Sequence, residues 1–253
     1  MGRYDLARIR SEIKPFRLHW FARLRSTNDY AALLRRKGRL FAPAAVLTSR
    51  QVAGRGRGSN TWWSDPGCLT VTFALPIDDH LAAHQLPLVA GLAVRNAAAS
   101  LAAKPGIQLK WPNDLLFEGK KLAGLLCERA HKADLVGVGL NVNFESSPPA
   151  SLRSRIVSLS QIAGMQIDPS AAVIAIAEQF KALLLRRSEH PFGAILREYD
   201  RHHALIGRGV SINGTPDEPV ITGTCQGLDS MGRLLVRTRT RLHRVIAGQV
   251  ELH

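Results

Sequence analysis

The sequence predicts an α+β domain followed by a small all-β barrel, and three observations lead to this fold class. Residues 86–101 place apolar side chains at the 3.6-residue spacing of a helix. Several short β-type segments precede and follow this helix in the chain. From about residue 207 the pattern changes to short β-type runs separated by turn signals such as Asn213-Gly214. We therefore expect one domain in residues 1–205 and a small barrel in residues 206–253.

The elements of the larger domain are expected in a simple order. Residues 1–17 form a basic, poorly periodic lead with no assigned element. The sequence Ser-Thr-Asn at 26–28 is typical of a helix cap, and apolar residues follow it at helical spacing. Residues 51–60, rich in glycine and arginine, indicate a loop. Strands are expected at 18–22, 44–49, 69–75, 108–110, 122–128 and 135–142, and helices also at 173–184 and 192–200.

Composition excludes several classes of protein. The 253 residues are 45% hydrophobic and 21% charged, which argues against a wholly disordered chain. No stretch approaches the roughly 20 apolar residues of a membrane helix, and the N-terminus lacks the apolar core of a signal peptide. The three cysteines are widely spaced and suggest neither a zinc site nor a disulfide framework. A reducing cytoplasm is the expected location.

The charge is the unusual feature of the composition. Lys and Arg total 34 and Asp and Glu total 20, so the formal net charge is +14. Residues 1–60 hold 14 basic and 3 acidic side chains, a net charge of +11. A basic chain first suggests a nucleic-acid-binding module. Aromatic residues make up only 6%, however, and the tryptophans cluster in candidate ligand motifs, which argues against base stacking along one basic element.

A Gly-Arg-Gly-Arg-Gly segment at 54–58 is the first candidate for ligand binding. Alternating glycines let a backbone approach a ligand closely, and the arginines between them suit a carboxylate or phosphate. The segment is not a P-loop, because no Gly-Lys-Ser/Thr follows it, and it is not the dinucleotide fingerprint, because Ser59 stands at the third glycine position. A flexible basic loop explains the segment equally well. Trp62 and Trp63 follow it, and each ring can stack on a base or belong to the core.

Two further segments combine polar and apolar residues. Lys-Trp-Pro-Asn-Asp at 110–114 carries an amide suited to a heterocycle edge and a carboxylate suited to a metal, although an Asx turn between strands explains it too. Lys-Lys-Leu-Ala-Gly at 120–124 follows it and also suits a solvated hairpin tip. In residues 136–143, valines and leucine alternate with glycines and asparagines, which predicts a strand with one apolar and one ligand-facing or helix-facing side.

The joint order of these motifs resembles the biotin protein ligases, from about residue 16 to the C-terminus. The glycine–arginine loop and the pair of lysine-containing segments are the most specific parts of the resemblance. The motifs that carry it are Ser26-Thr27-Asn28, Gln51, Ala53-Gly54-Arg55-Gly56-Arg57, Trp62, Lys110 to Asp114, Lys121 to Gly124 and Gly139-Leu140-Asn141.

The resemblance implies a fold, a reaction and a location for the site. It implies an SH2-like catalytic domain with helices on a mixed sheet, followed by an SH3-like barrel. Biotin and ATP would give biotinyl-5′-AMP and pyrophosphate, and a carrier-protein lysine would then displace AMP. The implied biotin-binding residues are Ser26, Thr27, Asn28, Gln51, Gly54, Arg55 and Gly124. The implied catalytic pair is Arg57 and Lys121, and the adenylate side consists of these two with Trp62, Asn113 and Asn141.

The resemblance also implies cofactors and partners. Asp114 would help to hold Mg²⁺ beside ATP. The partner would be a biotin carboxyl carrier protein or another biotin-dependent carboxylase domain, with no membrane and no specific DNA. The ligase itself would be a monomer or a homodimer in the cytoplasm. Only 25 residues precede Ser26, so we expect no N-terminal DNA-binding domain. The alternatives are a lipoate- or octanoate-type protein ligase and a basic nucleic-acid-binding module.

Three details remain as hypotheses from the sequence. In a regular strand, Lys121 and Gly124 would point to opposite faces, so we expect Gly124 to contribute only its backbone. The loop at 54–61 is expected to be mobile without ligand. The basic cluster at residues 35–37 (Arg-Arg-Lys) is a candidate for steering an acidic carrier domain, since opposite charges speed association.

Overall fold

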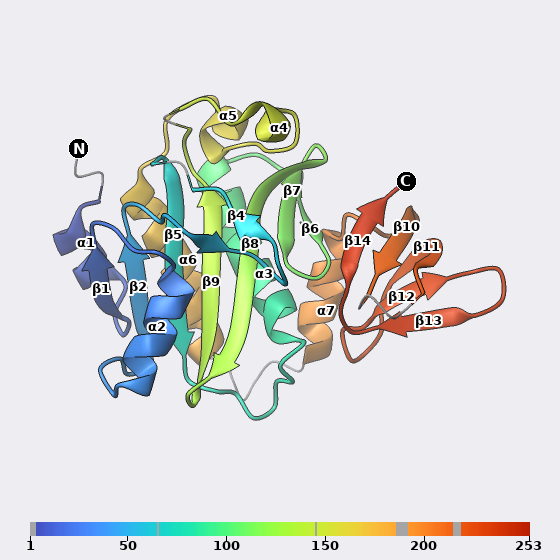
Figure 1. The fold of residues 1–253 in the computed structure, drawn as a ribbon, viewed down its shortest axis with the longest axis horizontal. Coiled ribbons are helices and arrows are strands. Elements are labelled where there is room, and N and C mark those ends of the chain that lie inside the picture. The colour runs from blue at the N-terminus through green and yellow to red at the C-terminus, as the bar shows by residue number, and fades with distance from the viewer. Residues whose placement is uncertain (1–3, 65, 145, 186–191, 215–218) are drawn as a thin grey trace.

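The computed structural model describes residues 4–64, 66–144, 146–185, 192–214 and 219–253. They form a seven-stranded mixed sheet with helices and a separate five-stranded antiparallel sheet at the C-terminal end (Figure 1). The expected α+β fold with an all-β part at its C-terminal end is therefore confirmed.

The larger sheet has the order β1-β2-β5-β9-β8-β7-β6. β1 and β2 are parallel, and the other neighbouring strands are antiparallel. All eight residues of β5 and all nine of β9 are buried, which explains why β5 alternates only weakly in sequence. The strands are β1 (Arg17–Phe21), β2 (Ala44–Thr48), β5 (Cys68–Leu75), β6 (Ile107–Lys110), β7 (Asp114–Phe117), β8 (Lys120–Ala130) and β9 (Ala133–Asn141).

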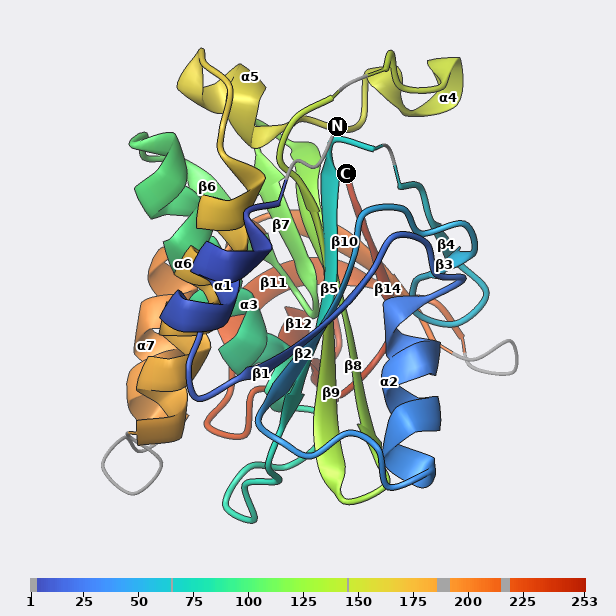
Figure 2. The ribbon, with the colours of Figure 1, turned by 90° about the vertical axis from the view of Figure 1, so that its left-hand side faces the viewer.

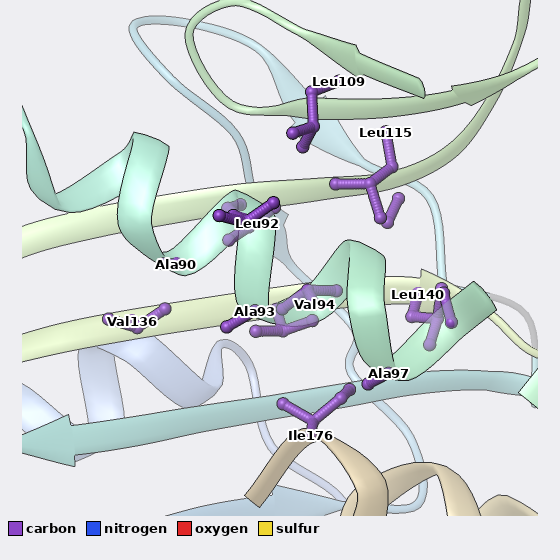
Figure 3. Packing of buried hydrophobic residues seen from close by; sticks show 14 of the residues in the cluster. Ala90, Leu92, Ala93, Val94, Ala97, Leu109, Leu115, Val136, Leu140 and Ile176 are labelled. Atoms are coloured by element: carbon purple, nitrogen blue, oxygen red, sulfur yellow. The ribbon is translucent and has the colours of Figure 1, made fainter. Parts of the chain in front are cut away.

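Helices cover both faces of this sheet (Figure 2). α3 (Leu86–Ala102), α6 (Pro169–Leu185), α1 (Leu6–Glu12) and α7 (Phe192–Arg201) lie on one side, with α2 (Thr27–Arg36) on the other. Figure 3 shows the main core, in which alanines and valine of α3 pack against apolar side chains of β6, β7 and β9 and against Ile176 of α6. Two short helices, α4 (Ala150–Arg153) and α5 (Leu159–Ala163), follow the long hairpin of β8 and β9.

The N-terminal lead contains a helix that the sequence did not predict. Asp5 caps α1 by accepting the backbone N–H of Arg8 at 3.0 Å. Ile9 and Ile13 are fully buried in the main core, and Asp5 N–H donates to Ser170 Oγ on α6 at 2.9 Å. A seven-residue helix with so few apolar positions has no clear period, so its packing partner decides its structure.

The C-terminal sheet has the order β13-β12-β11-β10-β14 and lies beside β6 and α7 (Figure 1). The Trp111 indole N–H donates to the carbonyl of Gly232 at 3.4 Å, and the backbone of Leu109 bonds the segment after α7. These contacts place the smaller sheet next to the turn between β6 and β7. In the described part of the chain, we find no helix with the length and apolarity needed to span a membrane. The strands of the C-terminal sheet are β10 (Gly209–Asn213), β11 (Ile221–Leu228), β12 (Leu234–Arg237), β13 (Leu242–Val245) and β14 (Gln249–Leu252).

Candidate active site

The residues that the sequence singled out surround one cleft of about 1910 Å³. Its walls come from the start of α2, the hairpin of β3 (Gly54–Arg55) and β4 (Thr61–Trp62), the β6–β7 turn, β8, β9 and the C-terminal sheet. Every site residue predicted from the sequence lines this cleft except Gly54. The fold thus brings together motifs that lie more than a hundred residues apart.

A polar pocket lies at the start of α2. Ser26 caps the helix, because its Oγ accepts the backbone N–H of Asp29 at 3.3 Å. Thr27 N–H donates to Gln51 Oε1 at 2.9 Å. Thr27 and Asn28 are buried, and Thr72 Oγ on β5 donates to Asn28 Oδ1 at 2.6 Å. Buried polar groups are costly unless paired, so this network holds the pocket in a defined arrangement.

Two glycines of β9 make room for the side chains above them. A Cβ on Gly137 would lie 2.3 Å from Asn28 Oδ1, and a Cβ on Gly139 would lie 2.3 Å from Trp62 Cε2. Of the predicted glycine–asparagine face, Gly137, Gly139 and Asn141 line the cleft. The alternate apolar residues of this strand belong to the core. Gly137 and Gly139 were visible in sequence as a period-two pattern, but their partners were not.

The glycine–arginine loop is a short hairpin in the structure, where the sequence indicated only a loop. Gly54 pairs with Trp62 and Arg55 with Thr61. A Cβ on Gly54 would lie 2.6 Å from both Gln51 Nε2 and the Trp62 carbonyl oxygen, so glycine is needed for this close approach. The Trp62 indole lies over Gly139, and its buried Nε1 has no hydrogen-bond partner among the described residues. The hairpin thus places Trp62 in the cleft.

The predicted catalytic cations approach the cleft from different elements. Arg57 Nη1 donates to Asn113 Oδ1 at 3.4 Å and to the Gly248 carbonyl at 3.2 Å. Desolvation lowers the pKa of Arg57, and nearby Asp114 opposes the shift. Lys121 Nζ lies 2.7 Å from Asp114 Oδ1 and 5.8 Å from the centroid of a Trp62 ring. Two positive groups thus border the space next to Trp62.

A β-bulge removes the regular strand on which the expectation of opposite faces for Lys121 and Gly124 depended. Asp114 pairs with Gly124 and Leu116 with Lys121, so β8 has one extra residue in this ladder. The bulge breaks the alternation, and a Cβ on Gly124 would lie 3.1 Å from Lys121 Cε. Both residues therefore face the cleft, although Lys121 lies inside the strand. Sequence spacing alone assumes a regular pleat and cannot reveal such an insertion.

The two asparagines predicted at the adenylate side already have protein partners. Asn113 Nδ2 donates to the Leu125 carbonyl at 2.6 Å. Asn141 is 2% exposed, and its amide donates to the carbonyls of Val157 at 3.1 Å and Lys121 at 3.3 Å. In this arrangement Asn141 ties β8 to the segment before α5. Its contact with a nucleotide stays a prediction.

The structure adds residues for which the sequence gave no role. Lys110 lines the cleft, and desolvation lowers its pKa, with Asp114 opposing and Lys121 adding to the shift. Gly248 is in the β13–β14 turn, and nothing in its sequence context indicated a contact with Arg57. Among the described residues, no three His, Cys, Asp or Glu side chains gather as a metal site.

Comparison with known families agrees with this architecture. Residues 20–145 match the biotin/lipoate A/B protein ligase family, and residues 205–252 match the biotin protein ligase C-terminal domain. These two matches place the fold in the class that the biotin and lipoate protein ligases share. The chain belongs to the biotin protein ligase family. It is 33% identical over 227 residues to the biotin–[acetyl-CoA-carboxylase] ligase of Paracoccus denitrificans, covering 85% of this chain and 92% of that protein.

Other relatives differ in extent. A bifunctional ligase/repressor of Bacillus spizizenii is 31% identical over 218 residues, and the match covers 82% of this chain and 65% of that protein. The chain thus spans about two thirds of that relative's length. The solved biotin protein ligase of Aquifex aeolicus in complex with biotin and ATP superposes with a TM-score of 0.83 at 29% identity, covering 94% of this chain and 98% of that one.

Proposed function

We propose that this protein activates biotin with ATP and transfers it to a lysine of an acceptor protein. The observation that carries this proposal is the position of Arg57 and Lys121 in the same cleft as a buried polar pocket and Trp62. The names of its relatives support the same activity, since they include biotin–[acetyl-CoA-carboxylase] ligases and a structure holding biotin and ATP.

The polar pocket is the proposed site for the ring system of biotin. Its ureido group needs both donors and acceptors, which hydroxyl and amide side chains supply. Thr27, Asn28 and Gln51 are held by the hydrogen-bond network around Thr72. These side chains therefore lose little further conformational freedom when a ligand binds. Gly54, Arg55 and Gly124 are the remaining proposed biotin-binding residues, together with Ser26.

The two cations are the proposed catalytic groups. In the first step, a biotin carboxylate oxygen attacks the α-phosphorus of ATP, and the bond to pyrophosphate breaks. Arg57 and Lys121 would stabilise the charge that develops between carboxylate, α-phosphate and leaving group. In the second step, the acceptor amine attacks the acyl carbon and AMP leaves. Trp62 would stack on adenine, with Asn113 and Asn141 next to the nucleotide.

Asp114 is the proposed carboxylate for Mg²⁺. It is the one acidic residue among the described residues that line the cleft. Mg²⁺ at nucleotide sites commonly takes one or two carboxylates and fills its other positions with phosphate oxygens and water. The site therefore fits a Mg²⁺ that binds together with ATP, where it would neutralise phosphate charge. The short Asp114–Lys121 pair also orients Lys121 toward the same space.

The acceptor is proposed to be a carrier domain of a biotin-dependent carboxylase. Arg35 in the proposed steering cluster at residues 35–37 also has a structural role, because its guanidinium donates to the carbonyls of His131 at 2.7 Å and Leu40 at 2.8 Å. Arg35 therefore stabilises the β8–β9 turn. The steering hypothesis itself stays a prediction. Arg241 and Arg244 are exposed and line the cleft itself, so they are better placed to attract an acidic acceptor.

The finer description of the molecule belongs to the same proposal. The larger domain would be of the SH2-like type over residues 1–205, and the C-terminal sheet would be an SH3-like barrel over residues 206–253. The protein would work in the cytoplasm as a monomer or homodimer, without specific DNA. The similarity to biotin protein ligases over both parts of the chain supports this assignment.

Biotin-dependent exchange of pyrophosphate into ATP tests the proposal directly. Wild-type protein should catalyse exchange with biotin, and not with lipoate or octanoate. Arg57→Ala and Lys121→Ala should each reduce exchange at least about a hundredfold, as expected for the loss of a preorganised charge. Lys120→Ala is the matched control, because Lys120 is exposed and outside the cleft lining. Exchange with lipoate or octanoate alone would assign the protein to the other branch of the family.

A further inference from the structure

The hairpin of β3 and β4 belongs to neither large sheet. It nevertheless supplies Arg57 and Trp62 to the cleft. Its position therefore depends on side-chain contacts and on the segments that lead into it, because no neighbouring strand fixes its register. Any contact that ties the hairpin to α2 or β8 then affects the geometry of the proposed active site.

Arg55 makes such a contact on two sides. Its Nη2 lies 2.7 Å from Asp29 Oδ1 on α2 and 3.1 Å from both carboxylate oxygens of Glu128 on β8. Glu128 Oε2 also accepts Asn28 Nδ2 at 2.8 Å. A single guanidinium thus joins the hairpin to the two elements that form the polar pocket.

The exposure of the three charged side chains indicates how strong this contact is. Arg55, Asp29 and Glu128 are 43%, 53% and 35% exposed, so water screens each pair. A weak pair is easily broken and remade. This suits a hairpin that must open to admit a ligand and close again over it. A deeply buried pair would instead hold the hairpin shut.

We propose that Arg55 is a positioning residue that fastens the β3–β4 hairpin over the polar end of the cleft by bridging Asp29 and Glu128. This rests on the proposed function for the identity of the enclosed ligand, which is biotin. Arg55 Nη2 is shared between the two carboxylates, so we assign the Arg55 side chain to holding the hairpin, and only the Arg55 backbone to the proposed contact with biotin. Closure retains the ligand and places Arg57, two residues further along the same hairpin, beside it.

A comparison of variants separates this role from direct binding. Arg55→Gln removes the positive partner of this contact, and the double variant Asp29→Asn/Glu128→Gln removes both negative partners. The side chain introduced by Glu128→Gln still offers an amide oxygen that can accept the hydrogen bond from Asn28 Nδ2. Each should raise the KM for biotin in pyrophosphate exchange about three- to tenfold, with kcat within about twofold, as expected for losing exposed ion pairs. Arg36→Gln, an exposed arginine at the other end of α2, should change neither.

The triple variant decides between the two roles. If Arg55 acts through the two carboxylates, adding Arg55→Gln to the double variant has no further effect on the KM for biotin. If Arg55→Gln raises the KM for biotin in the double variant by the same factor as in wild type, Arg55 binds the ligand itself and the proposal is wrong. In wild type, raising the salt concentration should increase this KM, whereas the double variant should respond much less. An equal response would also refute the proposal.

A measurement without substrate keeps this proposal separate from the proposed function. Chymotrypsin cleavage after Trp62 and Trp63 should be faster in Arg55→Gln and in the double variant than in wild type, since a released hairpin exposes these sites. Arg36→Gln should be cleaved at the wild-type rate. Unchanged cleavage in all variants would show that other contacts hold the hairpin, whether or not the protein uses biotin.

Discussion

Gly139→Ala should disable the cleft while leaving the fold intact. A Cβ at this position would lie 2.3 Å from Trp62 Cε2 and 2.6 Å from Cζ2. Ordinary van der Waals contact begins at 3.4 Å, so the indole must move by about 1.1 Å to restore it. The backbone of β9 pairs with β5 on one side and β8 on the other, so the strand cannot yield. The ring, and the hairpin that carries it, must move.

The expected loss is large because the hairpin also carries Arg57. A misplacement of about 1 Å in a positioning group can reduce a rate about a hundredfold. We therefore expect kcat/KM for biotin-dependent pyrophosphate exchange to fall about a hundredfold. The free energy of unfolding, measured in urea, should fall by about 1–3 kcal/mol, the usual range for overpacking.

Two variants show whether the clash with Trp62 is the cause. Gly209→Ala is the matched control, because its Cβ would lie 3.7 Å from His253 Cβ and Gly209 itself does not line the cleft. Trp62→Phe combined with Gly139→Ala should recover part of the exchange activity, since the smaller ring leaves room. Wild-type exchange by Gly139→Ala would refute the reasoning, as would a combined variant no better than the single one.

Three other predictions concern the acceptor, the N-terminal helix and acid stability. Arg241→Glu should raise the KM for an acidic acceptor domain and leave pyrophosphate exchange unchanged, whereas Arg10→Glu, an exposed arginine outside the cleft and outside the 35–37 cluster, should alter neither. Ile9→Ala should lower the free energy of unfolding in urea by about 2–5 kcal/mol, because Ile9 is fully buried; a change below about 1 kcal/mol would show that α1 packs weakly. Desolvation raises the pKa of Asp229, but hydrogen bonds and charge from Arg233 outweigh it, so the pKa is lowered on folding. The carboxylate therefore adds stability above its unfolded pKa, and Asp229→Asn should be destabilising at neutral pH. That difference should disappear as the pH falls through the folded pKa in urea titrations at several pH values; a difference independent of pH would contradict it.

Long elements with a regular pattern were predictable from the sequence. α3 has enough apolar residues at helical spacing to be recognised without its partners, and the alternation in β9 indicated which side is polar. α1 and β7 were not predictable, because seven and four residues carry too little periodic signal. β3 and β4 have two residues each, and only their pairing across the Gly-Arg turn defines them as strands.

The sequence by itself determined the kinds of chemical group present and the family they resemble. Local spacing records residue type and order, so it indicated cations, amides and glycines suited to an acid, a phosphate and a ring. Only the tertiary structure decided how they meet. The bulge that turns Lys121 and Gly124 to one face depends on pairing with β7, and the carbonyl that holds Arg57 comes from Gly248, 191 positions away. Such contacts arise from packing between distant segments, which no short-range pattern encodes.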